Sequence, residues 1–190
     1  MKRTKTVYNP VGLQMARDYE RCFSTMCHHV DNEWYGQPFL LEDWQRENMW
    51  KPLLACGDMD SLGFRRRYRR ALIGLPSGYG KTEFAAGLLL TFATMEPKYN
   101  GEYGLVASSL DQVAKIQTKV KTMIHLNPEW DRQWDCSSKV ITHRETGAKI
   151  IVLPNKADAL ESWHFNIIIF DELHVYKDDK VWNAGIKGQK

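Results

Sequence analysis

The chain has 190 residues and a formal net charge of +3; 43% of its residues are hydrophobic and 26% are charged. This balance is typical of one globular domain with a hydrophobic core and argues against a disordered chain. The apolar runs fall short of the roughly 20 residues that span a bilayer, and residues 1–5 lead into no signal-peptide core. We therefore expect a cytoplasmic protein with no membrane partner.

In the first half of the chain, residues 8–60 are predicted to be mostly helical. An arginine-rich stretch at residues 65–70 leads into an apolar strand predicted over Arg70–Ile73. A turn that contains glycine and proline follows at residues 76–82. Almost every residue from 84 to 94 is apolar, which predicts a helix that is buried all round.

The second half alternates predicted strands and helices. Tyr103–Ala107 is a predicted buried strand, and Ser109 is predicted to cap the next helix. The apolar face of that helix comprises Leu110, Val113, Ile116, Val120, Met123 and Ile124. Residues 140–142 and 149–153 predict a hairpin, and the apolar run 167–170 predicts a strand buried on both faces of a mainly parallel sheet. The alternation indicates an α/β fold, in which ligands bind beyond the carboxyl ends of the strands.

The turn Pro76–Thr82 has the composition of a phosphate-binding loop. Gly78 and Gly80 allow positive φ angles, so that successive N–H groups can surround an anion. Lys81 would lie against the β and γ phosphates, and the Thr82 hydroxyl would bind Mg²⁺. The strict loop pattern has glycine where this chain has Leu75, but the predicted strand before the turn and the helix after it are the context that such a loop requires.

A second half-site follows the apolar run 167–170. Asp171 would hold Mg²⁺ at the end of the buried strand, and Glu172 would polarise the attacking water. Because the loop and this carboxylate pair are both expected at the carboxyl ends of parallel strands, the sequence predicts an ATP hydrolase that uses ATP and Mg²⁺.

These residues resemble the large terminase subunits of tailed bacteriophages over about residues 38–176. The resemblance is carried by Trp44-Gln45, the arginine-rich approach, residues 75–82, residues 107–114 and Phe170–His174. It implies a P-loop ATPase of the ASCE/RecA-like group, with a mainly parallel sheet flanked by helices and a helical N-terminal segment. Relatives often lack the first loop glycine, which accounts for Leu75.

The resemblance also implies a biological role. Large terminases use ATP hydrolysis to drive double-stranded DNA into a capsid, as a pentameric ring on the portal protein, together with a small terminase subunit, in the cytoplasm of the infected bacterium. It assigns the catalytic roles to Lys81 and Glu172 and the metal role to Thr82 and Asp171. The nucleotide-binding residues that it implies are Trp44, Gln45, Pro76, Ser77, Gly78, Tyr79, Gly80, Lys81 and Thr82, with Gln45 reading the adenine edge.

One position departs from the family. Many relatives have arginine where this chain has Ser77, and serine cannot neutralise charge in the transition state. Arg65 to Arg70 are the nearest replacements, acting on their own site or on that of a neighbouring subunit. A solvated surface or contact with the DNA backbone is an equally good interpretation of this cluster.

We expect residues 1–60 to form the helical segment on the adenine side and residues 61–190 to form the ATPase core. The coupling segment and the nuclease domain of the family are not encoded within residues 1–190, so we expect the N-terminal ATPase part of a motor. Two alternatives stay open. The sequence Asp171–His174 also fits a DExH helicase-like DNA or RNA translocase, and a non-hydrolysing nucleotide- or DNA-binding module is the second possibility.

Overall fold

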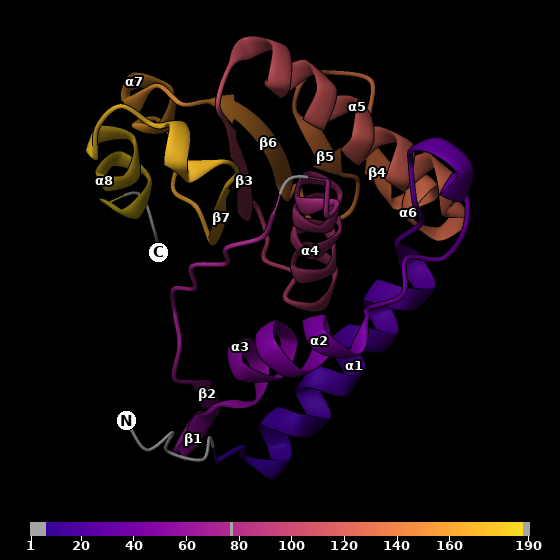
Figure 1. Ribbon diagram of the computed structural model, residues 1–190, viewed down its shortest axis with the longest axis vertical. Helices are drawn as coiled ribbons and strands as arrows, with labels where there is room; N and C mark the ends of the chain where they lie inside the picture. Colours follow the sequence, from indigo (N-terminus) through magenta and orange to yellow (C-terminus); the bar gives the residue numbers. More distant parts are fainter. Residues whose placement is uncertain (1–6, 77, 188–190) are drawn as a thin grey trace.

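The computed structural model describes residues 7–76 and 78–187, and its centre is a five-stranded sheet (Figure 1). The strands are β3 (Glu102–Ala107), β4 (Trp134–Asp135), β5 (Ile141–His143), β6 (Lys149–Pro154) and β7 (Ile167–Phe170), in the order β4-β5-β6-β3-β7. β3 lies parallel to both of its neighbours, with Leu105 opposite Val152 of β6 and Ile169 of β7. β5 pairs antiparallel with β6 and with β4. The predicted α/β fold with a mainly parallel sheet is thus confirmed, as is the hairpin.

The N-terminal segment is mainly helical, as expected, and ends in a small hairpin. Its elements are α1 (Pro10–Met26), the 3₁₀ turn η1 (Asn32–Trp34), α2 (Asp43–Gln45), the π-helical turn η2 (Arg46–Trp50), α3 (Lys51–Ala55), β1 (Gly57–Asp60) and β2 (Gly63–Arg66). Asn9 caps α1 by accepting a hydrogen bond from the Val11 amide at 2.9 Å. The Trp50 indole donates to the Ala16 carbonyl, which joins η2 to α1.

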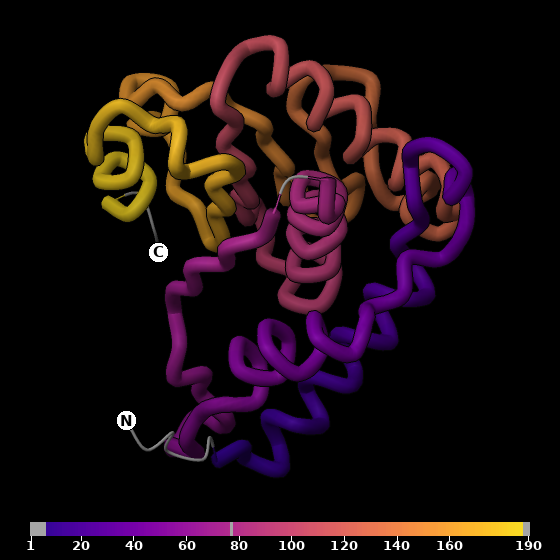
Figure 2. Tube along the Cα trace, viewed as in Figure 1, coloured from indigo at the N-terminus to yellow at the C-terminus, as the bar shows by residue number. Residues whose placement is uncertain are grey.

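Helix α4 (Lys81–Met95) lies between the sheet and the N-terminal helices, as Figures 1 and 2 show. Residues 84–93 are all buried, which confirms the helix that their apolar character predicts. Phe92 packs edge-to-face against Tyr19 of α1 with the ring centroids 5.4 Å apart. α4 therefore contributes to a core that the N-terminal segment and the sheet share.

Both ends of α4 are bonded to the N-terminal segment. Near its start, the Glu83 carboxylate accepts from the Val30 amide at 2.6 Å and contacts His29 Nδ1 at 3.1 Å. Just after its end, the Glu96 carboxylate accepts from the Tyr19 hydroxyl at 2.5 Å and pairs with Arg66 at 2.7 Å. Each carboxylate thus fixes a different part of the N-terminal segment to the same helix.

Helices α5 (Leu110–Leu126) and α6 (Pro128–Gln133) follow β3. The Ser109 hydroxyl caps α5 by accepting from the Gln112 amide, as expected. Most of the predicted apolar face is buried, but Leu110 is 64% exposed because it opens the helix, a turn and a half before the first buried position, Ile116. The remaining elements are α7 (Ala157–Leu160), the 3₁₀ turn η3 (Leu173–Val175) and α8 (Lys180–Lys187). Among the described residues, none of the helices is long and apolar enough to cross a membrane.

Two expectations about strands are wrong. Arg70–Ile73 forms no strand; it belongs to an extended connection from β2 to α4 that runs apart from the sheet (Figure 2). Leu72 is 86% exposed there, because Gly74 and Pro76 disfavour strand pairing and no described strand lies beside the segment. β7 is half-buried rather than buried on both faces, because it forms the edge of the sheet and pairs only with β3.

Candidate nucleotide site

The two glycines of the turn have the backbone geometry that the sequence predicts. Gly78 and Gly80 have φ angles of 84° and 64°, in the left-handed region that glycine adopts without strain. Gly80 is the N-cap of α4, and its carbonyl accepts from the Phe84 amide at 2.9 Å. Ser77 lies outside the described residues. The turn therefore brings the chain directly to the N-terminus of a 15-residue helix, where free N–H groups and the helix dipole favour an anion.

Lys81 is turned back over this loop. Its ammonium group donates to the carbonyl of Leu75 at 3.1 Å and to that of Pro76 at 3.4 Å. The positive charge thus lies beside the residues that lead into the turn.

The two halves of the predicted site meet at the start of α4. Thr82 Oγ1 donates to Asp171 Oδ2 at 2.6 Å, although 89 positions separate the two residues. Asp171 is 9% exposed, and its amide donates to the Val106 carbonyl, which continues the β3–β7 pairing. Neighbouring oxygens in an octahedral Mg²⁺ shell are about 3 Å apart, so this hydroxyl and carboxylate fit two adjacent positions of such a shell.

Within the described ranges, no group of three or more His, Cys, Asp or Glu side chains could hold a metal ion. This composition agrees with the way Mg²⁺ is held beside phosphates, by one or two protein oxygens together with phosphate oxygens and water. Thr82 and Asp171 are the two described side chains whose oxygens meet at this point.

Glu172 has an unusual backbone conformation. Its φ and ψ angles are 51° and 42°, a left-handed conformation that costs a non-glycine residue about 1–3 kcal/mol. Its Oε2 accepts a hydrogen bond from the Ser108 hydroxyl at 3.2 Å. Ser108 follows β3 directly, so the two residues come from the adjacent ends of neighbouring parallel strands.

Tyr176 fixes the turn that follows Glu172. Its hydroxyl lies 3.1 Å from the carbonyl oxygens of both Val106 and Asp171, and so bridges the ends of β3 and β7. Burial, followed by the charges of Asp171 and Glu172, raises the pKa of Tyr176, which keeps the hydroxyl protonated as a donor. The sequence analysis missed Ser108 and Tyr176. The signal for Ser108 was its place directly after the strand predicted beside the carboxylate pair.

On the expected adenine side, the structure separates the two predicted residues. The Trp44 and Tyr79 rings pack edge-to-face with centroids 6.4 Å apart, which brings α2 and the loop together. Gln45 is only 6% exposed, and its side-chain oxygen accepts from the Glu42 amide as part of a helix cap. Asn48, which the sequence analysis missed, is one turn further along the same face as Trp44.

A cavity of about 430 Å³ lies between η2 and α3 on one side and the connection from β2 on the other. Its lining includes Trp44, Asn48, Pro52, Tyr68, Arg70 and residues 71–75, and it does not include Gln45. Leu75 is one of the lining residues, and its carbonyl accepts a hydrogen bond from Lys81. The lining thus includes the residue that directly precedes the phosphate loop. It also includes the Trp44 ring and the Asn48 amide.

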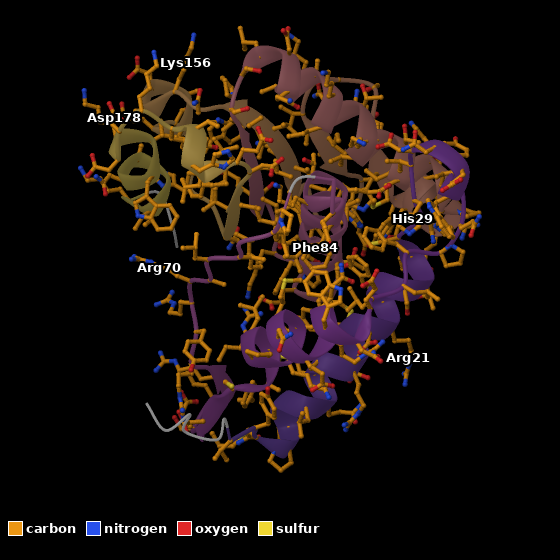
Figure 3. All side chains as sticks on the ribbon, in the orientation of Figure 1. Arg21, His29, Arg70, Phe84, Lys156 and Asp178 are labelled. Atoms are coloured by element: carbon orange, nitrogen blue, oxygen red, sulfur yellow. The ribbon has the colours of Figure 1, made fainter. Side chains whose placement is uncertain are left out.

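The arginine-rich stretch divides into two groups. Arg66 pairs with Glu96 and lies over the Phe92 ring at 5.2 Å; Arg67 pairs with Asp58 at 3.2 Å, and Arg65 lies 3.9 Å from Asp60. Arg69 and Arg70 form no ion pair with any other residue that the structure describes. Figure 3 shows Arg70 at the edge of the molecule, on the connection between the hairpin and α4.

Comparison with known proteins identifies the family to which this site belongs. Residues 61–188 match the sequence model of the family described as terminase large subunit, ATPase domain. The chain belongs to this family. Terminase ATPase domains hydrolyse ATP, and the family assignment therefore implies that this chain uses a nucleotide. The resemblance inferred from the motifs is confirmed.

A solved structure supports the same fold. The chain superposes on the crystal structure of the HK97 bacteriophage large terminase with a TM-score of 0.74 and 18% sequence identity. The match covers 91% of this chain and 34% of that chain, so the chain spans about a third of the terminase that it matches. The predicted P-loop ATPase fold is thereby confirmed. No curated protein matches the sequence.

Proposed function

We propose that this chain is the ATP-hydrolysing part of a viral packaging motor, in which Mg²⁺-dependent hydrolysis of ATP drives double-stranded DNA into a capsid. The observation that carries the proposal is the hydrogen bond between Thr82 and Asp171, with Glu172 as the next residue. It joins a phosphate-type loop to a carboxylate pair at one end of the sheet. Phosphoryl transfer requires this combination of anion binding, a metal position and a base.

The roles of the residues follow from their chemistry. The loop amides and Lys81 would bind the β and γ phosphates, and Thr82 and Asp171 would hold Mg²⁺. When bound, the metal neutralises the charge that develops on the phosphate oxygens. Glu172 would accept a hydrogen bond from the attacking water and orient it in line with the scissile bond.

The family assignment supports further parts of the proposal. The partners would be double-stranded DNA, the portal protein and the small terminase subunit, and the working assembly would be a pentameric ring in the cytoplasm of the infected host. Residues 1–60 would support the nucleotide from the adenine side and residues 61–190 would form the catalytic core. The terminase match favours this function over a helicase-like translocase.

The proposal is tested by separating binding from hydrolysis. Lys81→Ala should abolish binding of ATP, because the loop loses its only flexible point charge for the phosphates. Glu172→Gln should keep the affinity for ATP and remove turnover, because an amide cannot take up a proton from water. The exposed residues Lys115 and Glu145 provide matched controls, and Lys115→Ala and Glu145→Gln should leave both quantities unchanged. Equal turnover above background in the wild type and in Glu172→Gln would exclude Glu172 as the base, whereas ATP binding without turnover in the wild type would favour a non-hydrolysing binding module.

A further inference from the structure

The carboxylate of Glu172 is held from a neighbouring strand. Ser108 Oγ donates to Glu172 Oε2 at 3.2 Å, and both residues are only partly accessible. The β3–β7 register places Val106 opposite Phe170, so that Ser108 and Glu172 occupy equivalent positions two residues further along their strands. The contact therefore joins the segments that directly follow two hydrogen-bonded parallel strands.

The backbone of Glu172 requires such support. A left-handed conformation at a non-glycine residue persists only where its surroundings fix it. Two hydroxyl groups supply that support: Tyr176 bonds to main-chain carbonyls at the ends of β3 and β7, and Ser108 bonds to the carboxylate. Of the two, only Ser108 contacts the side chain that would act on water.

We propose that Ser108 is a positioning residue that fixes the Glu172 carboxylate for ATP hydrolysis. This role rests on the proposed function. The adjacent hydroxyl has a different role, because Ser109 caps α5 through the Gln112 amide. A base that orients water must be held close to one geometry, and a second residue that fixes its rotamer contributes to the rate without contacting substrate. Ser108 therefore acts on kcat through Glu172.

The kinetic test uses Ser108→Ala, Ser108→Thr and the control Ser109→Ala. Ser108→Ala should lower kcat about tenfold, since a hydrogen bond to a charged group is lost, while KM for ATP and the affinity for a non-hydrolysable ATP analogue stay unchanged. Ser108→Thr retains the hydroxyl and should restore turnover. Ser109→Ala should weaken α5 against unfolding without changing kcat. An unchanged or increased kcat in Ser108→Ala, or a loss that Ser108→Thr does not restore, would overturn the assignment.

A second measurement needs no turnover. The urea midpoints of Ser108→Ala, Glu172→Ala and the double variant form a cycle, and the double variant should shift the midpoint by less than the sum of the single shifts. Additive shifts would show that the contact is not made in solution and would exclude the proposal. If the wild-type chain fails to hydrolyse ATP, the proposed function is wrong, and the cycle still decides whether Ser108 holds Glu172.

Discussion

Thr82 and Asp171 are 89 positions apart in the sequence, yet the threonine hydroxyl donates to the aspartate carboxylate at 2.6 Å. The contact places the first turn of α4 against the end of β7, which is the arrangement that a nucleotide-bound Mg²⁺ would need. It also gives the loop and the carboxylate pair a fixed relative position, so the effects of changing each residue can be predicted.

The first prediction concerns metal dependence. Thr82→Ala removes one of the two adjacent oxygens, and we expect it to raise the Mg²⁺ concentration needed for half-maximal ATP hydrolysis about tenfold or more. Thr82→Ser retains the hydroxyl and should behave like the wild type. Thr118→Ala, on the exposed side of α5, is the control for removing a threonine hydroxyl from a helix. Identical Mg²⁺ titrations for Thr82→Ala and Thr118→Ala would contradict a metal role for Thr82.

The second prediction separates the arginines. Arg70 lines the same cavity as Leu75, whereas Arg69 lies with the charged residues of the hairpin. We predict that Arg70→Ala lowers kcat by roughly 10³-fold without lowering stability, and that Arg69→Ala changes neither. Arg66→Ala should instead lower the free energy of unfolding by about 1–2 kcal/mol, because it breaks the pair with Glu96.

The dependence of turnover on protein concentration shows whether Arg70 acts on its own site or on that of a neighbouring copy. If it acts on a second copy, turnover per molecule should rise with concentration in the wild type and stay flat in Arg70→Ala. Wild-type turnover in Arg70→Ala at every concentration would remove it as the source of the missing positive charge.

The third prediction concerns the adenine side. We expect Trp44→Ala to raise KM for ATP about tenfold, because stacking of a base on an aromatic ring contributes about 1–3 kcal/mol. Asn48→Ala should reduce the preference for ATP over GTP, since the amide lines the cavity beside Trp44. Gln45→Ala should mainly lower stability, because its oxygen caps α2. A loss of ATP preference in Gln45→Ala and not in Asn48→Ala would return the adenine role to Gln45.

The fourth prediction is a pH dependence of stability. Burial beside Trp134 lowers the pKa of His143 below its ordinary value of 6.5, so the folded state disfavours the protonated ring. As the pH falls through about 6.5 the unfolded chain takes up a proton before the folded chain does, and stability should therefore fall as the pH is lowered. Urea midpoints at about pH 7.5 and about pH 5.5 measure the effect. His143→Asn should reduce the difference between the two midpoints; an unchanged difference would assign the acid sensitivity to other groups.

Local patterns were sufficient for much of this fold. Apolar residues predicted burial in α4 and β3, Ser109 predicted a helix cap, and the two loop glycines predicted positive φ angles. The structure agrees with each of these predictions. The strand predicted at Arg70–Ile73 failed because an apolar run does not reveal whether a pairing partner lies beside it. The contact between Ser108 and Glu172 depends on strand register, and the division of the arginines depends on which carboxylates the hairpin brings close. Neither is visible before the chain is folded.

The attachment of α4 at both ends has a mechanical consequence. Glu83 and Glu96 bond opposite ends of the helix to the N-terminal segment, and residues 84–93 between them are buried. Such a helix cannot rotate or slide without breaking charged hydrogen bonds at one end. We therefore expect any displacement that accompanies hydrolysis to arise elsewhere. The exposed connection from β2 to α4 has neither constraint, and we expect any such displacement to involve it.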